Sequence, residues 1–242
     1  EAKIQYLVAD LSSQKQIREC AEKIATLIKE NQHEALDVLV NNAGVYMGQK
    51  TFTKDGIEMT FAVNHLAPFL LTHLLLPLLE KSSRGRVITV SSDSHYNTLL
   101  FPERAKNPIF FFGLLAYKAS KLCNVLFSFE FNRLNNGRVT QAFAVDPGLV
   151  NTDIGLKDTG GLAKLVWRSR QKLGVPPEEP AQTILFLAED SGADASISIY
   201  WYKCQAKVPA RNATNDKLAR RLWMESCRLT GVAYPEGVEN VL

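Results

Sequence analysis

The chain has 242 residues, of which 46% are hydrophobic and 22% are charged, and its formal net charge is +3. This length is enough for one domain with a sizeable core, and the composition is ordinary for a globular protein. So small a charge gives no argument for binding to nucleic acid or to an anionic membrane. The four cysteines form no C-x-x-C pair, so we expect reduced and mostly buried thiols, and neither they nor the histidines predict a metal site.

Strand and helix signals alternate in the first half of the chain. The predicted elements are a strand over 4–9, a helix that starts at Ser12 or Ser13, an apolar strand that ends in the turn 41–44, a helix over 55–80 and a strand over 85–92. The most apolar part of the long helix, residues 67–79, is interrupted by Thr72, His73 and Pro77. We therefore expect a core or interface helix there and not a membrane span.

The same alternation continues to the end of the chain. After a loop rich in Phe and Pro come a helix over 114–131, a strand from Arg138 to Gly148, a Gly-bearing stretch over 151–177, a helix over 178–190, a strand over 196–204 and a helix over 215–229. Near-continuous apolar strands separated by helices predict an α/β fold with a doubly wound, mostly parallel, Rossmann-like sheet. Ligands bind at the carboxyl ends of such strands, where this chain concentrates its polar residues.

The helix over 114–131 carries Tyr117 and Lys121 four positions apart, so both side chains lie on one face. They could form an ordinary surface pair whose stems cover apolar neighbours. Alternatively, a nearby cation favours the ionised form of a phenol, which can then exchange a proton near neutral pH. The other polar residues at the same edge of the sheet decide between these readings.

Five motifs resemble the short-chain dehydrogenase/reductase family, in the family's order and spacing. They are "NNAG" at 41–44, "NHLAPFLLT" from Asn64, "GRVITVSS" ending at Ser92, "YKASK" at 117–121 and "PGLVNT" at 147–152. The likeness covers nearly the whole chain, and it is greatest to the retinol dehydrogenase-like and WW-domain oxidoreductase-like branch. It implies one NAD(P)-binding domain over 1–242, with a substrate lid at about 155–177.

The resemblance implies four catalytic residues. Tyr117 would donate or accept the proton, Lys121 would favour the phenolate and bind the nicotinamide ribose, Ser92 would hold the substrate oxygen, and Asn64 would anchor a water that relays protons to Lys121. Ser91 could take this role in place of Ser92, but the family spacing favours Ser92.

Other residues are expected to bind the cofactor, with Asp10 at the adenine and Thr152 on the carboxamide. The full implied set is Asp10, Asn41, Ala43, Gly44, Tyr117, Lys121, Pro147, Gly148, Val150 and Thr152. The branch implies NADP more than NAD. His95 lies near the site in the sequence, and we expect it to be solvated.

The chain departs from the family in two places. The Gly-rich turn T-G-x-x-x-G-x-G and the first βαβ unit are not present, so we expect an N-terminally truncated domain with weak or no cofactor binding on its own. Ile199 stands where the branch usually has Gly, and its side chain could crowd the substrate end or face a roomier core.

These motifs predict an oxidoreductase that transfers a hydride between NAD(P) and an apolar carbonyl or alcohol, such as a retinoid, steroid or lipid aldehyde. One alternative is a fold-retaining scaffold without turnover, and another is an epimerase or dehydratase. No nucleic acid is expected as a partner, whereas peripheral membrane contact through the lid and a homodimer are both open. The resemblance places the protein in the cytoplasm or on the cytosolic side of an internal membrane.

Overall fold

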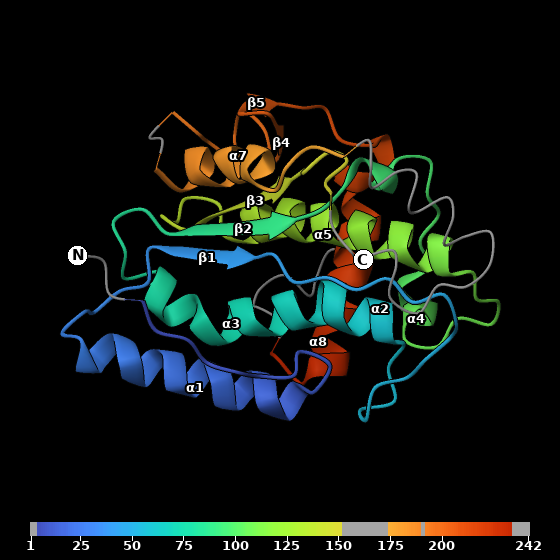
Figure 1. Cartoon of the computed structure of the whole chain (residues 1–242), viewed down its shortest axis with the longest axis horizontal. Helices are drawn as coiled ribbons and strands as arrows, with labels where there is room; N and C mark the ends of the chain where they lie inside the picture. The colour runs from blue at the N-terminus through green and yellow to red at the C-terminus, as the bar shows by residue number, and fades with distance from the viewer. Residues whose placement is uncertain (1–3, 152–173, 190–191, 234–242) are drawn as a thin grey trace.

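The computed structural model describes residues 4–151, 174–189 and 192–233 (Figure 1). Its sheet has the order β1-β2-β3-β4-β5, and every neighbouring pair is parallel except β4 with β5. The strands are β1 (Val38–Asn41), β2 (Arg86–Val90), β3 (Gln141–Val145), β4 (Tyr200–Tyr202) and β5 (Gln205–Ala206). The prediction of an α/β fold with a mostly parallel sheet is therefore confirmed.

Alternating side chains on β3 explain why helices cover both faces of the sheet. Phe143 and Val145 pack with Leu187 of helix α7 (Glu178–Glu189) on one face. Ala142 and Ala144 point to the other face, where the small side chains give room for helix α5 (Gly113–Leu134). Figure 1 shows α7 on one side of the strands, with helices α3 (Ala67–Leu79) and α1 (Gln14–Glu30) on the other.

Helix α8 (Asp216–Thr230) joins α3 and α5 through an aromatic cluster centred on Trp223. The Trp223 ring stacks on Phe127 of α5 at 5.7 Å and meets Phe69 of α3 edge-on at 5.1 Å. Such contacts add to the stabilisation from burial alone. Helix α8 thus packs against both α3 and α5, and the homodimer stays a prediction.

The predicted helix over 55–80 begins four residues later and is not uniform. A turn at Thr53–Gly56, with Gly56 at φ +70°, precedes it, and the Glu58 carboxylate accepts hydrogen bonds from Thr60 N and Phe61 N at its start. Three pieces follow one another: α2 (Met59–Phe61), the π-helical turn η1 (Ala62–Leu66) and α3. The π-turn inserts an extra residue, which is common at functional sites.

The span Met59–Leu79 is long and apolar enough to cross a membrane, but 67% of its most apolar window is buried inside the protein. Helix α1 covers the outer side of α3, where Ile17 packs against Ala67 and Leu70. This burial is typical of the core helix of a globular domain, as the interruptions in the sequence predicted.

The predicted strand over 4–9 is wrong. These residues form no regular element, and Ile4 and Val8 are 90% and 91% exposed. A β-rich sequence forms a strand only where it finds a partner, and β1 is the last strand on its side of the sheet. Within the described residues, no strand pairs with the outer edge of β1.

The predicted strand over 196–204 is shorter than expected and turns back on itself. Lys203 and Cys204 both have positive φ, which makes the two-residue turn that links β4 to the antiparallel β5. Neither residue is the Asn or Gly that usually marks such a turn, so no local pattern predicted it. Shorter elements lie elsewhere: the 3-10 helices η2 (Asp93–His95) and η3 (Arg211–Thr214) and helix α4 (Pro102–Ala105).

Candidate active site

Two serines follow β2 at the carboxyl edge of the sheet, and they have different environments. Ser91 continues the pairing with β3 through a hydrogen bond from its amide to the Val145 carbonyl. The Ser91 hydroxyl is buried and donates to the Lys121 carbonyl at 2.7 Å. Ser92 is half-buried, and its hydroxyl accepts from the Ser94 amide at the start of η2. Ser91 therefore anchors α5 to β2, whereas Ser92 remains partly accessible to solvent.

His95 is buried, so the expectation that it is solvated is wrong. Its Nε2 accepts a hydrogen bond from the Ala210 amide at 3.0 Å, and its Nδ1 lies 2.7 Å from the Ser92 carbonyl oxygen. An amide can only donate, so the proton must be on Nδ1, which donates to Ser92. Burial lowers the pKa of His95 and keeps the ring neutral. His95 thus fixes the backbone of Ser92.

Tyr117 and Lys121 share one face of α5, as their spacing predicted. The Lys121 Nζ lies 5.5 Å from the centroid of the Tyr117 ring and donates to the Val90 carbonyl at 2.9 Å. Burial lowers the pKa of Lys121 to about 8. Tyr117 is half-buried, and its ring packs at 5.9 Å against the ring of Tyr46, which follows the turn at 41–44. The end of β2 therefore holds the ammonium beside the phenol.

Asn64 lies in the π-turn and is completely buried. Its Oδ1 accepts from the Val45 amide at 2.7 Å, while its Nδ2 donates to the Val45 carbonyl and to the Ser120 hydroxyl, both at 2.9 Å. One side chain thus joins the loop after β1 to α5, one position before Lys121. The expected water at Asn64 stays a prediction.

Asp146 connects several parts of this edge, and the sequence did not single it out as a site residue. Its Oδ1 accepts from the amides of Asp93 and Gly148, and its Oδ2 pairs with Lys207 Nζ at 2.6 Å. Burial opposes the charge on Lys207, but the Asp146 carboxylate outweighs burial and raises the pKa of Lys207. The place of Asp146 at a strand end before Pro147 was a usable signal, whereas nothing local marked Lys207.

The residues expected to bind the cofactor divide into two groups. One group lies at or just after the carboxyl ends of β1 and β3, at the same edge of the sheet as Ser92, which follows β2. This group is Asn41, Ala43, Gly44, Pro147, Gly148 and Val150. The buried Asn41 amide reaches the hydroxyls of Thr72 and Thr89, so it joins β1 to α3 and β2. Asp10 lies at the start of α1, where hydrogen bonds from Ser12 lower its pKa, and none of its described hydrogen bonds reaches β1. Thr152 lies outside the described residues.

Most of the expected lid, 155–177, also lies outside the described residues, but its last residues are joined to the chain that precedes it. Val150 forms a parallel bridge with Val175, and a Cβ on Gly174 would lie 2.6 Å from the Asn151 amide nitrogen. Ile199 packs against the core cluster that contains Leu122 and Ala144. Its extra side chain therefore meets the core, which answers the question that the sequence left open.

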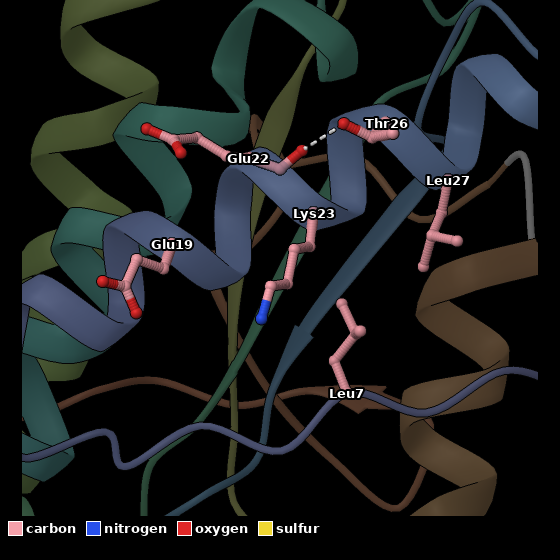
Figure 2. Close-up of a pocket in the computed structure, with 6 residues that line it drawn as sticks. All are labelled: Leu7, Glu19, Glu22, Lys23, Thr26 and Leu27. Atoms are coloured by element: carbon pink, nitrogen blue, oxygen red, sulfur yellow. Dashed lines mark hydrogen bonds between the residues drawn. The ribbon is translucent and has the colours of Figure 1, made fainter.

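A surface depression lies away from these residues, between α1 and the segment before it (Figure 2). Its lining is Leu7, Glu19, Glu22, Lys23, Thr26 and Leu27. Figure 2 shows the Thr26 hydroxyl bonded to the Glu22 carbonyl, while the charged side chains extend along an open helix face. We place no chemistry there. Within the described part of the chain, no three His, Cys, Asp or Glu side chains are grouped to hold a metal.

The match to known proteins is consistent with this geometry. The family model "short chain dehydrogenase" matches residues 1–159. The chain belongs to the short-chain dehydrogenase family.

Curated relatives and solved structures extend this result. The short-chain dehydrogenase described here is 38% identical to human retinol dehydrogenase 12 over 226 residues, which are 93% of this chain and 69% of the relative. It is 34% identical to human polyprenol dehydrogenase over 243 residues, covering 95% of this chain and 70% of that protein. A crystal structure of a protein from Mycobacterium paratuberculosis is similar with a TM-score of 0.67 and 28% identity, covering 94% of this chain and 75% of that chain.

The family consists of NAD(P)-dependent oxidoreductases that act on small molecules, and this short-chain dehydrogenase is one of them. We expect its described residues at the strand ends to hold the nicotinamide end of the cofactor. Gly148 has φ +68°, and its amide shares the Asp146 Oδ1 with the amide of Asp93, so the backbone turns tightly close to the residue that follows Ser92. The described residues contain no Gly-rich turn of the family's form for the pyrophosphate end.

Proposed function

We propose that this enzyme interconverts an apolar alcohol and its carbonyl compound, with Tyr117 as the proton donor and acceptor. The observation that carries this proposal is the position of the Lys121 ammonium, buried 5.5 Å from the Tyr117 ring centroid and held by the end of β2. When bound, the nicotinamide cofactor supplies or takes up the hydride. The chain's own residues then have to orient the substrate oxygen and move one proton.

Each of the four candidate residues has a separate task in this proposal. The half-buried Ser92 hydroxyl holds the substrate oxygen beside the Tyr117 hydroxyl, and Lys121 stabilises the phenolate that remains after the proton has left. Asn64 positions the loop after β1 and links to α5 through Ser120. We also propose that the water next to Asn64 connects Lys121 to solvent, so that the proton is replaced between turnovers.

The names of two relatives support an apolar substrate, since retinol and polyprenol are both long apolar alcohols. We propose a retinoid, steroid or lipid alcohol or aldehyde for this chain, with NADP as the cofactor. The scaffold alternative rests on the Gly-rich turn that is not found in the chain. The intact set Asn64, Ser92, Tyr117 and Lys121 favours the enzyme.

The test is the Tyr117→Phe substitution, which removes one hydroxyl. Turnover of retinal and retinol, followed by the absorbance of the reduced nicotinamide, should fall by about 10²–10⁴-fold because the proton has no donor. Cofactor affinity, measured by nicotinamide fluorescence, should change less than about threefold because the ring remains. The matched control is Tyr6→Phe, the same change at an exposed tyrosine.

Two outcomes would contradict the proposal. Turnover in Tyr117→Phe equal to that of the wild type would remove the phenol from the mechanism. Wild-type protein that neither binds NADP or NAD nor oxidises any alcohol of this class would support the scaffold alternative for the 242-residue chain.

A further inference from the structure

A segment of the chain between Ser92 and Tyr117 exposes an unusual amount of apolar surface. We call residues 99–115 the apolar loop; it includes the short helix α4. Phe110 is 83% exposed and Phe112 is 65% exposed. The apolar side chains of the loop that are more than half exposed include Leu99, Phe101, Ile109, Phe110, Phe112 and Leu115. Groups of exposed apolar residues mark surfaces that bind proteins or membranes.

The backbone of the apolar loop is attached to the rest of the domain at three points. The Lys106 carbonyl accepts from the Glu58 amide at 2.8 Å, and the Pro108 carbonyl accepts from Lys50 Nζ at 2.6 Å. At the start of α5, a Cβ on Gly113 would collide with the Met47 carbonyl oxygen, so the two backbones are in close contact there. A backbone held in this way presents its phenyl rings to solvent in a fixed arrangement.

The charges around the loop are positive. Within the described residues, no carboxylate pairs with Arg104, Lys106 or Lys118. The acidic residue of the loop, Glu103, is already neutralised by a two-point ion pair with Arg221 at 2.7 and 2.8 Å. The net charge of +3 on the whole chain gives no reason to expect an anionic partner, but this local excess does.

We propose that the apolar loop docks on the surface of an anionic lipid bilayer. Phenyl rings between cations match such a surface, because the rings enter the acyl boundary while the cations meet anionic headgroups. A second copy is less suitable, since a two-fold contact would place the same cations against one another. Docking brings the start of α5, one turn before Tyr117, to the bilayer, in which apolar substrates are dissolved. This part of the inference rests on the proposed function.

The experiment is flotation of the 242-residue chain with vesicles of phosphatidylcholine alone or mixed with phosphatidylserine. The wild type should float with the mixed vesicles, and added salt should release it because the headgroup attraction is screened. The double variant Phe110→Ser with Phe112→Ser should lower the partition constant by about tenfold or more, since two phenyl groups no longer enter the boundary. Thermal unfolding of each variant checks that it is folded.

The matched control exchanges two apolar residues that are also more than half exposed but lie at the opposite edge of the sheet, Val139→Ser with Ile197→Ser. These residues precede β3 and β4, and their loss should leave flotation within about twofold of the wild type. Equal losses in both double variants would overturn the proposal. Wild-type protein that stays in solution with both kinds of vesicle would also overturn it.

Light scattering distinguishes a lipid surface from a second copy of the chain as the partner of the apolar loop. A wild-type dimer that the Phe110 and Phe112 substitutions dissociate would assign the loop to self-association and overturn the lipid proposal. Flotation needs neither cofactor nor turnover. An inactive chain that floats would therefore contradict the proposed function alone, and an active chain that does not float would contradict only the docking.

Discussion

His65 gives the most direct test of the buried core beside the active site. The ring is completely enclosed, with Phe61, Phe69 and Phe127 around it at centroid distances of 5.3 to 6.5 Å. Its Nε2 donates to the Ser226 hydroxyl at 2.9 Å, since that hydroxyl itself donates to the Leu222 carbonyl. Burial lowers the pKa of His65 from 6.5 to about 3.

The consequence is a loss of stability on acidification. Above pH 6.5 the ring is neutral in both the folded and the unfolded chain, so its burial is not opposed by protonation. Below that value the unfolded chain binds a proton that the folded chain does not bind until about pH 3. From about pH 7.5 to about pH 5 this difference lowers the free energy of unfolding by about 2 kcal/mol.

Urea unfolding at both pH values, compared between the wild type and His65→Gln, measures this contribution. Burial also lowers the pKa values of His73 and His95, so the wild-type change contains their contributions as well. The substitution should remove about 2 kcal/mol of the pH dependence, because an amide can still donate to Ser226 but does not titrate. The control, His33→Gln, changes an exposed histidine. Equal losses on acidification in the wild type and His65→Gln would refute the reasoning.

Two further substitutions test the packing described above. Trp223→Ala should lower the free energy of unfolding by about 3–5 kcal/mol, because it empties the centre of the aromatic cluster, while Met224→Ala on the exposed side of the same helix should stay within about 0.5 kcal/mol in the same urea titration. Gly148→Ala should cost about 1–2 kcal/mol, because φ is +68° and the new methyl group would contact the Tyr202 ring; unchanged stability would show that this loop relaxes freely.

Local patterns were enough to predict the long helices and the central strands. The apolar period over 114–131 identified α5, and with it the shared face of Tyr117 and Lys121, because both depend only on residues a few positions apart. The polar turns after β1, β2 and β3 identified the carboxyl edge of the sheet in the same way. The resemblance to a family then supplied the roles, which the residues alone left open.

Features that depend on distant partners were not predictable from the sequence. The segment 4–9 has a β-rich composition, but a strand also needs a neighbour, and the sequence pattern contains no information on that. His95 looked like a loop histidine because its second hydrogen bond goes to Ala210, 115 positions later. The pair of Asp146 and Lys207 was hidden for the same reason, since 61 positions separate the two side chains.

The two serines after β2 make the chemistry of this edge depend on strand register. Neighbouring residues in an extended chain point in opposite directions, so Ser91 can reach α5 only if Ser92 faces outward. An insertion of one residue in β2 would move Ser91 to the outward position and put Val90 in the inward position, whereas a deletion would move Ser92 inward and put Asp93 outside. Two identical side chains in a row therefore do not make β2 tolerant of a shift in register, because each serine serves one face of the strand only.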